Sequence, residues 1–541
     1  MTELQSVTIG KYLEEQVKKF GSREAVVYSD LGIRYSYKDF YDLTVKVAKG
    51  LMSLGIKKGD HIAVWATNVP EWILLQFGSA RAGAVLVTVN TSYQQNELEY
   101  LLKQSDAKAL FLIEGFKNTS YVNMAYHIQS KSEQFPLLDQ LVYMGKGQPE
   151  GMSNWEEMLR SGENITEDEL LDRELSLEPS DVINMQYTSG TTGFPKGVML
   201  THSNILGNAH RLAAAMRLTH EDRLCIPVPF FHCFGCVIGT LTAVSAGAAM
   251  VPIVQFSPKE VLETVEKEKC TALHGVPTMF IAELNHPEFD QYDLSSLRTG
   301  VMAGSTCPIE VMKNVISKMG MSEITIAYGQ TETSPVFTQT TPDDPIEKRV
   351  ETVGRKHPGV EIKVIDPATG KRVAPGIQGE LCTRGYHVMK GYYKMPDATK
   401  EAIDHDGWLH TGDLAVMDDD GYVAITGRLK DMIIRGGENI YPREVEEFLY
   451  SHPSILDVQV IGVPDETFGE KVAACIQVKE GHSIGQEELA AFCQGKISKF
   501  KIPEYMIIVD EYPMTASGKI QKYKLREEAR QRIEAEKGIV T

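Results

Sequence analysis

The chain has 541 residues, of which 43% are hydrophobic and 24% charged, proportions that are typical of a globular protein and exclude a disordered or fibrous one. Its formal net charge of -18 repels a nucleic-acid backbone over most of the surface, which argues against DNA or RNA as a partner. Eight cysteines are too few for a disulfide scaffold, and the first residues hold no apolar signal-peptide core, so we expect a cytoplasmic protein.

The first predicted element is a helix that packs on the protein's own core. Ile9, Leu13, Val17 and Phe20 recur at helical spacing and form one apolar face. No run of eighteen apolar residues follows anywhere, so we expect no membrane span. Peripheral membrane contact through such a face, and assembly into a homo-oligomer, both stay open.

Two series of alternating strands and helices come next. The first contains "DHIAVWATN", the helical "PEWILLQFGSARAG", "AVLVTVN" and "KALFLIEG". The second begins with a helix at Ser203 and continues through "GAAMVPI", a helix capped by Ser257, "TALHG", "LRTGVMAG" and "ITIAYGQTE". Such alternation is typical of βαβ units, so we predict an α/β fold with two parallel-sheet subdomains.

Beyond about residue 350 the pattern changes to short strands separated by glycine. The stretches "GVEIKVID", "GIQGELCTRG" and "GYVAITGR" predict a small β-rich, barrel-like subdomain. After it, "EVEEFLYSH", "ILDVQVIGVP" and "VAACIQV" predict a compact α+β unit. We therefore divide the chain into an N-terminal domain, residues 1–428, and a small mobile C-terminal domain, residues 429–541.

The segment "YTSGTTGFPKG", residues 187–197, has the hydroxyls, glycines and lysine that suit a phosphate-binding loop. It is not a Walker A loop, because Lys196 is followed by Gly197 and the next residues predict a strand instead of a helix. Composition alone leaves a surface turn open. The apolar flanks favour a phosphate loop between two strands, with these candidate binding residues: Thr188, Ser189, Gly190, Thr191, Thr192, Gly193, Phe194, Pro195 and Lys196.

Four later motifs accompany this loop in a fixed order. They are "AYGQTE" at 327–332, "WLHTGD" at 408–413, "GRLKDMIIRGGENIYPREVE" at 427–446 and "PMTASGK" at 513–519. Together with the loop they resemble the signature of the AMP-forming adenylating enzymes, which include acyl-CoA synthetases, luciferases and peptide-synthetase adenylation domains. The resemblance covers nearly the whole chain. It implies that a carboxylate attacks the α-phosphorus of ATP and that pyrophosphate leaves.

The resemblance also implies a role for each motif residue. The loop would hold the β- and γ-phosphates, Thr331 the α-phosphate and Glu332 the Mg²⁺ ion. Tyr328 would pack on adenine, and Asp413 would accept from the ribose hydroxyls with Arg428 close by. Further candidates are Gly329, Gly304 and Ser305 around adenine, Lys519 as the adenylation lysine, His232 beside the acyl pocket, and Gly436 and Gly437 along the pantetheine arm of CoA.

The acid substrate is narrowed by what surrounds His232. The segment after Phe231 has no acidic residue to pair with an amino acid's ammonium, and "RGGENIYP" resembles fatty acyl-CoA synthetases. We therefore expect an ATP-dependent fatty acid–CoA ligase for medium- to long-chain acids, with fatty acid, ATP and CoA as substrates. A luciferase-like oxygenase, a ligase for aryl or other acids, and a nucleotide-binding pseudoenzyme stay open.

Cys233 and Cys236 form one C-x-x-C pattern that raises a redox or zinc site as an alternative. No second ligand pair accompanies it, and apolar residues surround both thiols. We interpret the two cysteines as packed side chains.

Overall fold

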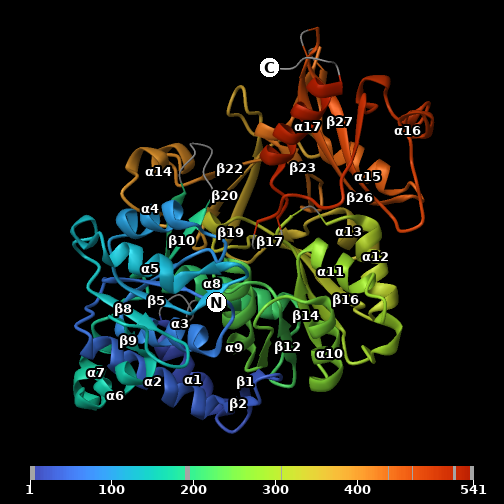
Figure 1. Ribbon diagram of the computed structural model, residues 1–541. Coiled ribbons are helices and arrows are strands. Elements are labelled where there is room, and N and C mark those ends of the chain that lie inside the picture. The colour runs from blue at the N-terminus through green and yellow to red at the C-terminus, as the bar shows by residue number, and fades with distance from the viewer. Residues whose placement is uncertain are drawn as a thin grey trace.

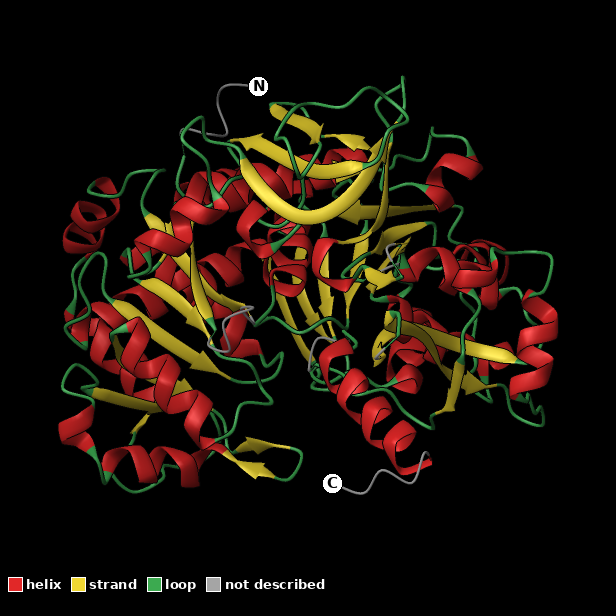
Figure 2. Ribbon diagram, turned by 90° about the horizontal axis from the view of Figure 1, so that it is seen from above, coloured by secondary structure: helices red, strands yellow, loops and turns green. Residues whose placement is uncertain are grey.

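The structure is a computed structural model that describes residues 7–188, 195–305, 307–436, 438–465, 467–515 and 519–536. Two large sheets form the body of the molecule, and the C-terminal unit, orange to red, sits above them (Figure 1). Seen from above, helices flank the strands of both large sheets (Figure 2). None of the described helices is both long and apolar enough to cross a membrane.

The first large sheet has the strand order β21-β11-β10-β4-β3-β5-β8-β9. Strand β3 pairs in parallel with both β4 and β5, whereas β10 and β11 are antiparallel. The predicted first βαβ series is thereby confirmed. The strands are β3 (His61–Trp65), β4 (Val85–Thr88), β5 (Ala107–Leu112), β8 (Gln140–Tyr143), β9 (Ser153–Asn154), β10 (Val182–Thr188), β11 (Lys196–Thr201) and β21 (Gly391–Tyr392), with a separate pair β6 (Gly115–Phe116) and β7 (Thr119–Ser120).

The second large sheet has the order β18-β17-β16-β15-β14-β12-β13-β1-β2. Its centre, from β13 through β12, β14 and β15 to β16, is parallel, as the second βαβ series predicts. The strands are β1 (Glu24–Tyr28), β2 (Ile33–Ser36), β12 (Arg223–Ile226), β13 (Ala249–Pro252), β14 (Ala272–Gly275), β15 (Thr299–Met302), β16 (Glu323–Tyr328), β17 (Thr338–Gln339) and β18 (Arg355–Lys356).

Helices fill the space around and between these sheets. Helix α3 is buried on nearly all sides, which its apolar sequence permits, and it contributes to the same core cluster as β3 and β12. The helices of this region are α1 (Ile9–Phe20), α2 (Tyr37–Ser53), α3 (Pro70–Ala82), α4 (Gln95–Ser105), α5 (Tyr121–Gln129), α6 (Trp155–Ser161), α7 (Glu167–Leu175), α8 (His202–Ala215), α9 (Thr242–Ala246), α10 (Pro258–Glu268), α11 (Pro277–Leu284), α12 (Ile309–Lys318), α13 (Ile346–Glu351) and α14 (Pro396–Ala402).

Helices α1 and α10 agree with their sequence signals, the first in its apolar face and the second in its N-terminal cap. Ile9 and Leu13 of α1 are buried, while Val17 and Phe20 pack partly buried against the same core, as the apolar face predicts. The Ser257 side chain accepts from the Glu260 N–H, and Pro258 occupies the first turn of α10.

The predicted β-rich subdomain is an antiparallel sheet of β19 (Val360–Ile365), β20 (Gly379–Gly385), β22 (Leu409–Met417) and β23 (Val423–Arg428), in that spatial order. The sequence predicts a barrel-like form. Over these described strands the order ends at β19 on one side and β23 on the other, so we describe an open sheet.

The C-terminal unit has an α+β fold with its own core, which explains how it can be a separate domain. Helices α15 and α16 pack on one face of its sheet, and α17 packs on the other. Its elements are β24 (Ile433–Arg435), β25 (Glu438–Ile440), α15 (Pro442–Tyr450), β26 (Ile455–Asp465), β27 (Gly469–Val478), α16 (Gln486–Cys493), β28 (Tyr505–Ile508) and α17 (Lys522–Glu536).

Candidate active site

The carboxylate of Asp413 is buried on strand β22, where that strand pairs with β23. Asp413 and Arg428 are cross-strand partners, and Arg428 Nε lies 3.0 Å from Asp413 Oδ1. The Tyr328 hydroxyl donates to Asp413 Oδ2 over 2.6 Å, and Gln330 Nε2 donates to the same oxygen over 3.2 Å. The Asp413 residue is only 3% exposed. These three polar partners offset the cost of burying the charge and fix the carboxylate in one orientation.

The electrostatics of this cluster keep its donors protonated. Burial, with a further contribution from Asp413, raises the pKa of the Tyr328 hydroxyl well above its usual value. Asp413 likewise raises the pKa of Arg428. Tyr328 therefore presents a neutral ring, whose edge also packs on Phe337 with ring centroids 5.2 Å apart.

The backbone just before Asp413 is held by a glutamate that sequence patterns did not reveal. Glu380 Oε1 accepts from the Gly412 N–H over 3.1 Å, and Glu380 Oε2 lies 3.0 Å from His410 Nδ1. Glu380, Cys382 and His410 hold ligand atoms within 4.8 Å of one another, a spacing that a metal ion could use. Because 3.0 Å is a hydrogen-bond distance, we interpret the group as a network that orients the strand β22 backbone at Gly412.

The candidate phosphate loop is held between paired strands. Thr188 ends β10 opposite Lys196 of β11, and the carbonyl of Pro195 accepts from the Tyr100 hydroxyl over 3.1 Å. The predicted strand-loop-strand arrangement is therefore present at both ends of the loop. Ser189, Gly190, Thr191, Thr192, Gly193 and Phe194 lie outside the described residues.

Tyr392 of β21 connects this loop to the candidate metal ligand. Lys196 Nζ lies 4.7 Å from the centroid of the Tyr392 ring, and the Tyr392 hydroxyl donates to Glu332 Oε1 over 2.8 Å. The Met389 N–H also donates to the Glu332 carbonyl over 2.9 Å. Lys196 and Glu332, far apart in the sequence, therefore contact the same side chain. Tyr392 itself lies in none of the motifs.

Thr331 and Glu332 stand in a short 3-10 turn, η6 (Thr331–Thr333), directly after β16. The chain bends there because Gly329 has no side chain: a Cβ at this position would lie 2.0 Å from the Pro335 carbonyl oxygen. The Gln330 N–H donates to the Thr333 hydroxyl over 2.8 Å and closes the turn. The motif therefore aims the Thr331–Glu332 pair from a fixed bend.

Lys519 enters this region from the C-terminal domain. A small cavity of about 10 Å³ is lined by Val228, Pro229, His232, Phe234, Val276, Gly304 and Lys519. The Lys519 Cε atom lies 3.7 Å from where a Gly304 Cβ would be, and Gly304 has φ +92°. A side chain there would narrow the space beside the lysine.

Burial lowers the pKa of Lys519 to about 8. Arg428 lowers it further, while Cys233, Glu332 and Asp413 act in the opposite direction. Burial, and then the charge of Lys519, lower the pKa of His232 well below its usual value. His232 Nδ1 accepts from the Phe234 N–H over 3.1 Å, so in the neutral ring the proton stands on Nε2.

Ser305 and Gly436 are two further predicted residues, and their described contacts are made by the backbone. Ser305 is exposed beyond β15, and its described contact is a backbone carbonyl that accepts from the Cys307 thiol. Gly436, with φ +59°, donates its N–H to the Phe468 carbonyl over 2.7 Å within the C-terminal domain. Gly437 lies outside the described residues. The structure therefore brings Lys519, and not Gly436, to the candidate nucleotide site.

The two motif cysteines lie in the hydrophobic core with Phe234, a residue that lines the cavity. Both are fully buried, and burial raises the pKa of Cys233 and raises that of Cys236 to about 12. Gln186 Nε2 donates to the Cys236 sulfur over 2.9 Å. These thiols stay protonated, which supports their interpretation as packed side chains.

Phe234, which lines the cavity beside Lys519, begins a π-helix, η4 (Phe234–Leu241), that the sequence does not predict. Gly235 permits the tight entry, since a Cβ there would lie 2.3 Å from the Pro229 carbonyl oxygen. π-turns are rare and occur most often at functional sites.

Comparison with known families agrees with this geometry. A model described as "AMP-binding enzyme" matches residues 13–393, and one described as "AMP-binding enzyme C-terminal domain" matches residues 444–519. The chain belongs to the AMP-binding enzymes.

Relatives match this AMP-binding enzyme over nearly its whole length. It is 61% identical over 537 residues to YngI of Bacillus subtilis, which carries the name of an acyl-CoA synthetase, with 97% of this chain and 98% of YngI covered. It is 42% identical over 545 residues to the mitochondrial medium-chain acyl-CoA ligase ACSF2 of Danio rerio, with 98% of this chain and 89% of ACSF2 covered.

Solved structures share the arrangement of this AMP-binding enzyme. The anthranilate CoA ligase AuaEII, in complex with anthranoyl-AMP, superposes with a TM-score of 0.86 at 26% identity, covering 98% of each chain. ATP-bound MatB from Rhodopseudomonas palustris superposes with a TM-score of 0.82 at 28% identity, covering 97% of this chain and 99% of MatB.

Proposed function

We propose that the protein is an ATP-dependent acyl-CoA ligase that forms acyl-AMP and pyrophosphate, then acyl-CoA and AMP. The observation that supports this proposal is that Lys519, from the C-terminal domain, lines a cavity with His232 and Gly304. The charges of Asp413, Arg428 and Glu332 are near enough to shift its pKa. The family and the named relatives support an AMP-forming acid–thiol ligase. The activity of ACSF2, named for medium-chain acids, favours fatty acids of that length as substrates here.

In the first half-reaction, a carboxylate oxygen of the fatty acid attacks the α-phosphorus of ATP. The bond from that phosphorus to the oxygen of pyrophosphate breaks as the new bond forms. Negative charge gathers on the phosphoryl oxygens, and the Lys519 ammonium offsets it at the point where carboxylate and phosphate meet. His232 is neutral and carries its proton on Nε2, so we assign it to donate to and position the fatty acid carboxylate.

The nucleotide is held by residues of the N-terminal domain. We propose that Asp413 accepts hydrogen bonds from the ribose hydroxyls, with Arg428 beside it. Tyr328, Gly329 and Gly304 would surround the adenine ring. Thr331 would contact the α-phosphate. Thr188 to Lys196 would hold the departing pyrophosphate. Ser305 keeps its predicted place at the edge of adenine as part of this proposal.

Magnesium fits the donor set on this side of the site. Glu332 offers a carboxylate oxygen, the ligand type that Mg²⁺ prefers, and Tyr392 holds that carboxylate in place by a hydrogen bond. When bound there, Mg²⁺ would neutralise phosphate oxygens of ATP.

In the second half-reaction, the CoA sulfur attacks the acyl carbon and loses its proton, and AMP leaves. We propose that the C-terminal domain turns near Lys430 for this step, withdrawing Lys519 and bringing the Gly436–Gly437 backbone to the pantetheine arm. Gly436 has a left-handed φ that favours glycine. A cytoplasmic location stays a prediction from composition.

One panel tests this function. Pyrophosphate release is measured with medium-chain, long-chain, aryl and amino acids, with and without CoA, and the products are identified by mass. We expect release with fatty acids and acyl-CoA only when CoA is present. An oxidised product would favour a luciferase-like oxygenase, and a preference for aryl acids would favour another CoA ligase. No turnover with any acid would favour a nucleotide-binding pseudoenzyme.

A further inference from the structure

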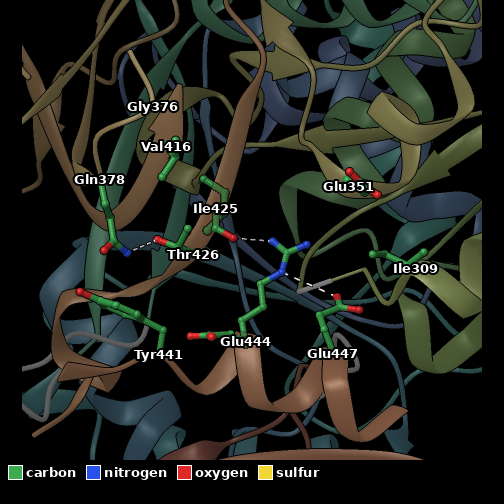
Figure 3. Close-up of a pocket in the computed structure, with 11 residues that line it drawn as sticks. Ile309, Glu351, Gly376, Gln378, Val416, Ile425, Thr426, Tyr441, Glu444 and Glu447 are labelled. Carbon is green, nitrogen blue, oxygen red and sulfur yellow. Dashed lines mark hydrogen bonds and ion pairs between the residues drawn. The ribbon is translucent and has the colours of Figure 1, made fainter. Parts of the chain in front are cut away.

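A cavity of about 380 Å³ lies between the two domains and shares no lining residue with the cavity beside Lys519 (Figure 3). Ile309, Gln378, Val416 and Thr426 of the N-terminal domain line it on one side, and Tyr441 and Arg443 of the C-terminal domain on the other. Because a cavity contributes no packing, the contacts at its rim have a large share in holding the two domains in this orientation.

A rim contact that joins the two domains is made by Arg443 in the first turn of α15. Its NH1 group donates to the Ile425 carbonyl of β23 over 2.7 Å (Figure 3). The Arg443 side chain is only 16% exposed, and its Nε lies 3.8 Å from Glu447 Oε1, one turn later in the helix. A largely buried guanidinium therefore links the C-terminal domain to the strand that ends at Arg428.

Glu447 adds a weaker contact between the same domains. Burial raises the pKa of its carboxyl, which Arg443 and then the Ile309 backbone N–H counteract. Ile309 begins α12, a helix without a side-chain cap of its own. Helix α15 thus contacts the N-terminal domain at two separate elements, β23 and α12.

We infer that Arg443 is a positioning residue that holds the C-terminal domain in the orientation that seats Lys519. The inference rests on the proposed two-step function. Ile425 stays with β23 when the C-terminal domain turns, whereas Arg443 moves with α15, so the turn must break their hydrogen bond. Arg443 stabilises the adenylation orientation and is released for thioester formation.

A quantitative signature follows from this two-state equilibrium. Each half-reaction runs only from its own orientation, so the ratio of the two rates is proportional to the ratio of the two populations. Loss of a hydrogen bond from a charged donor changes such a ratio about tenfold. A variant that merely weakens the fold lowers both rates together and leaves their ratio unchanged.

The test measures both half-reactions in single turnover for the wild type and for Arg443→Ala. Acyl-adenylate formation is followed by pyrophosphate release, and thioester formation starts from supplied acyl-adenylate and CoA. We expect the adenylation-to-thioester rate ratio to fall about tenfold in Arg443→Ala. Arg443→Lys keeps the positive charge and is a second variant in case Arg443→Ala misfolds. Its rate ratio should lie between those of the wild type and Arg443→Ala.

A matched control is Arg532→Ala. The Arg532 NH1 group also donates to a backbone carbonyl, that of Ile508 over 3.0 Å, but both residues belong to the C-terminal domain. Its rate ratio should equal that of the wild type. An unchanged ratio in Arg443→Ala, or an equal fall in Arg532→Ala, would overturn the assignment.

An activity-free measurement separates this inference from the proposed function. Spin labels on Lys318→Cys of α12 and Glu480→Cys of the C-terminal domain report the interdomain distance, since both positions are exposed and the eight native cysteines are buried. We expect Arg443→Ala to move population away from the wild-type distance. An identical distribution overturns the role of Arg443 whatever reaction the protein performs, whereas absent turnover with a shifted distribution overturns only the function.

Discussion

The proposed nucleotide pocket and the proposed adenylation lysine are built in opposite ways. Asp413, Arg428, Tyr328 and Gln330 all belong to the N-terminal domain and are joined by short polar contacts. Lys519 comes from the other domain, and its backbone N–H is bound to Thr515 of its own domain over 3.0 Å. The pocket that we propose for ATP is thus preorganised, while the lysine that we propose for adenylation would move as a unit with its domain.

The largest expected effect removes the delivered group. Lys519→Ala should lower the rate of acyl-adenylate formation about 100- to 1,000-fold, because the charge that develops on the phosphoryl oxygens loses its cation. Thioester formation from supplied acyl-adenylate should stay near the wild-type rate. Single-turnover assays measure the rates of both steps. An equal loss of rate in both steps would contradict a role of Lys519 in adenylation alone.

A smaller effect is expected from the preorganised side. Asp413→Ala should weaken ATP binding about 10- to 100-fold, because hydrogen bonds to a charged acceptor are lost and Arg428 is left unpaired. Titration calorimetry with ATP measures the affinity, and circular dichroism controls for folding. ATP affinity equal to that of the wild type would remove Asp413 from the ribose site.

The pKa of Lys519 gives a third, proton-scale test. In the ligand-free protein it is about 8, so at pH 9 the side chain is mostly neutral. Bound ATP phosphates favour the charged form, and the protein should therefore take up roughly half to one proton on binding ATP at pH 9. Calorimetry in two buffers of different ionisation enthalpy measures the uptake, which should disappear at pH 6 and in Lys519→Ala. Proton uptake that persists in the variant would have to come from another group.

The smallest effect on activity is expected from substitution of the two motif cysteines, Cys233 and Cys236. Cys233→Ala and Cys236→Ala should keep both half-reactions within about twofold and lower the free energy of unfolding by about 1 kcal/mol each. Metal analysis of the wild type should find no stoichiometric zinc. Bound zinc that is lost in both variants would revive the metal interpretation.

The sequence predicted the fold well because its strongest signals are local. Apolar strands alternate with helices in both large sheets, and glycine-punctuated strands mark the small antiparallel one. The C-terminal α+β unit was likewise visible from its own pattern, although its mobility and the boundary at residue 428 stay predictions.

The site was predictable only where one motif carries the chemistry. Asp413, Glu332 and Lys519 stand in recognisable segments, whereas Tyr392 and Glu380 act through contacts with residues distant in the chain. Arg443 stands in a motif, but nothing in the motif shows that its side chain reaches the Ile425 carbonyl. Strand alternation places Glu380 and Cys382 on one face, but nothing local gives the register that sets Cys382 opposite His410. Such partners need the tertiary structure.

The π-helix η4 limits how the cavity beside Lys519 can change. Its wider turns hold one residue more than an α-helix of the same span, and one residue corresponds to about 100° of rotation on a helix. Deleting a single residue within Phe234–Leu241 would therefore turn Phe234 and the adjoining His232 away from the cavity they share with Lys519. Chain length in this segment, as much as side-chain identity, therefore determines the shape of that cavity.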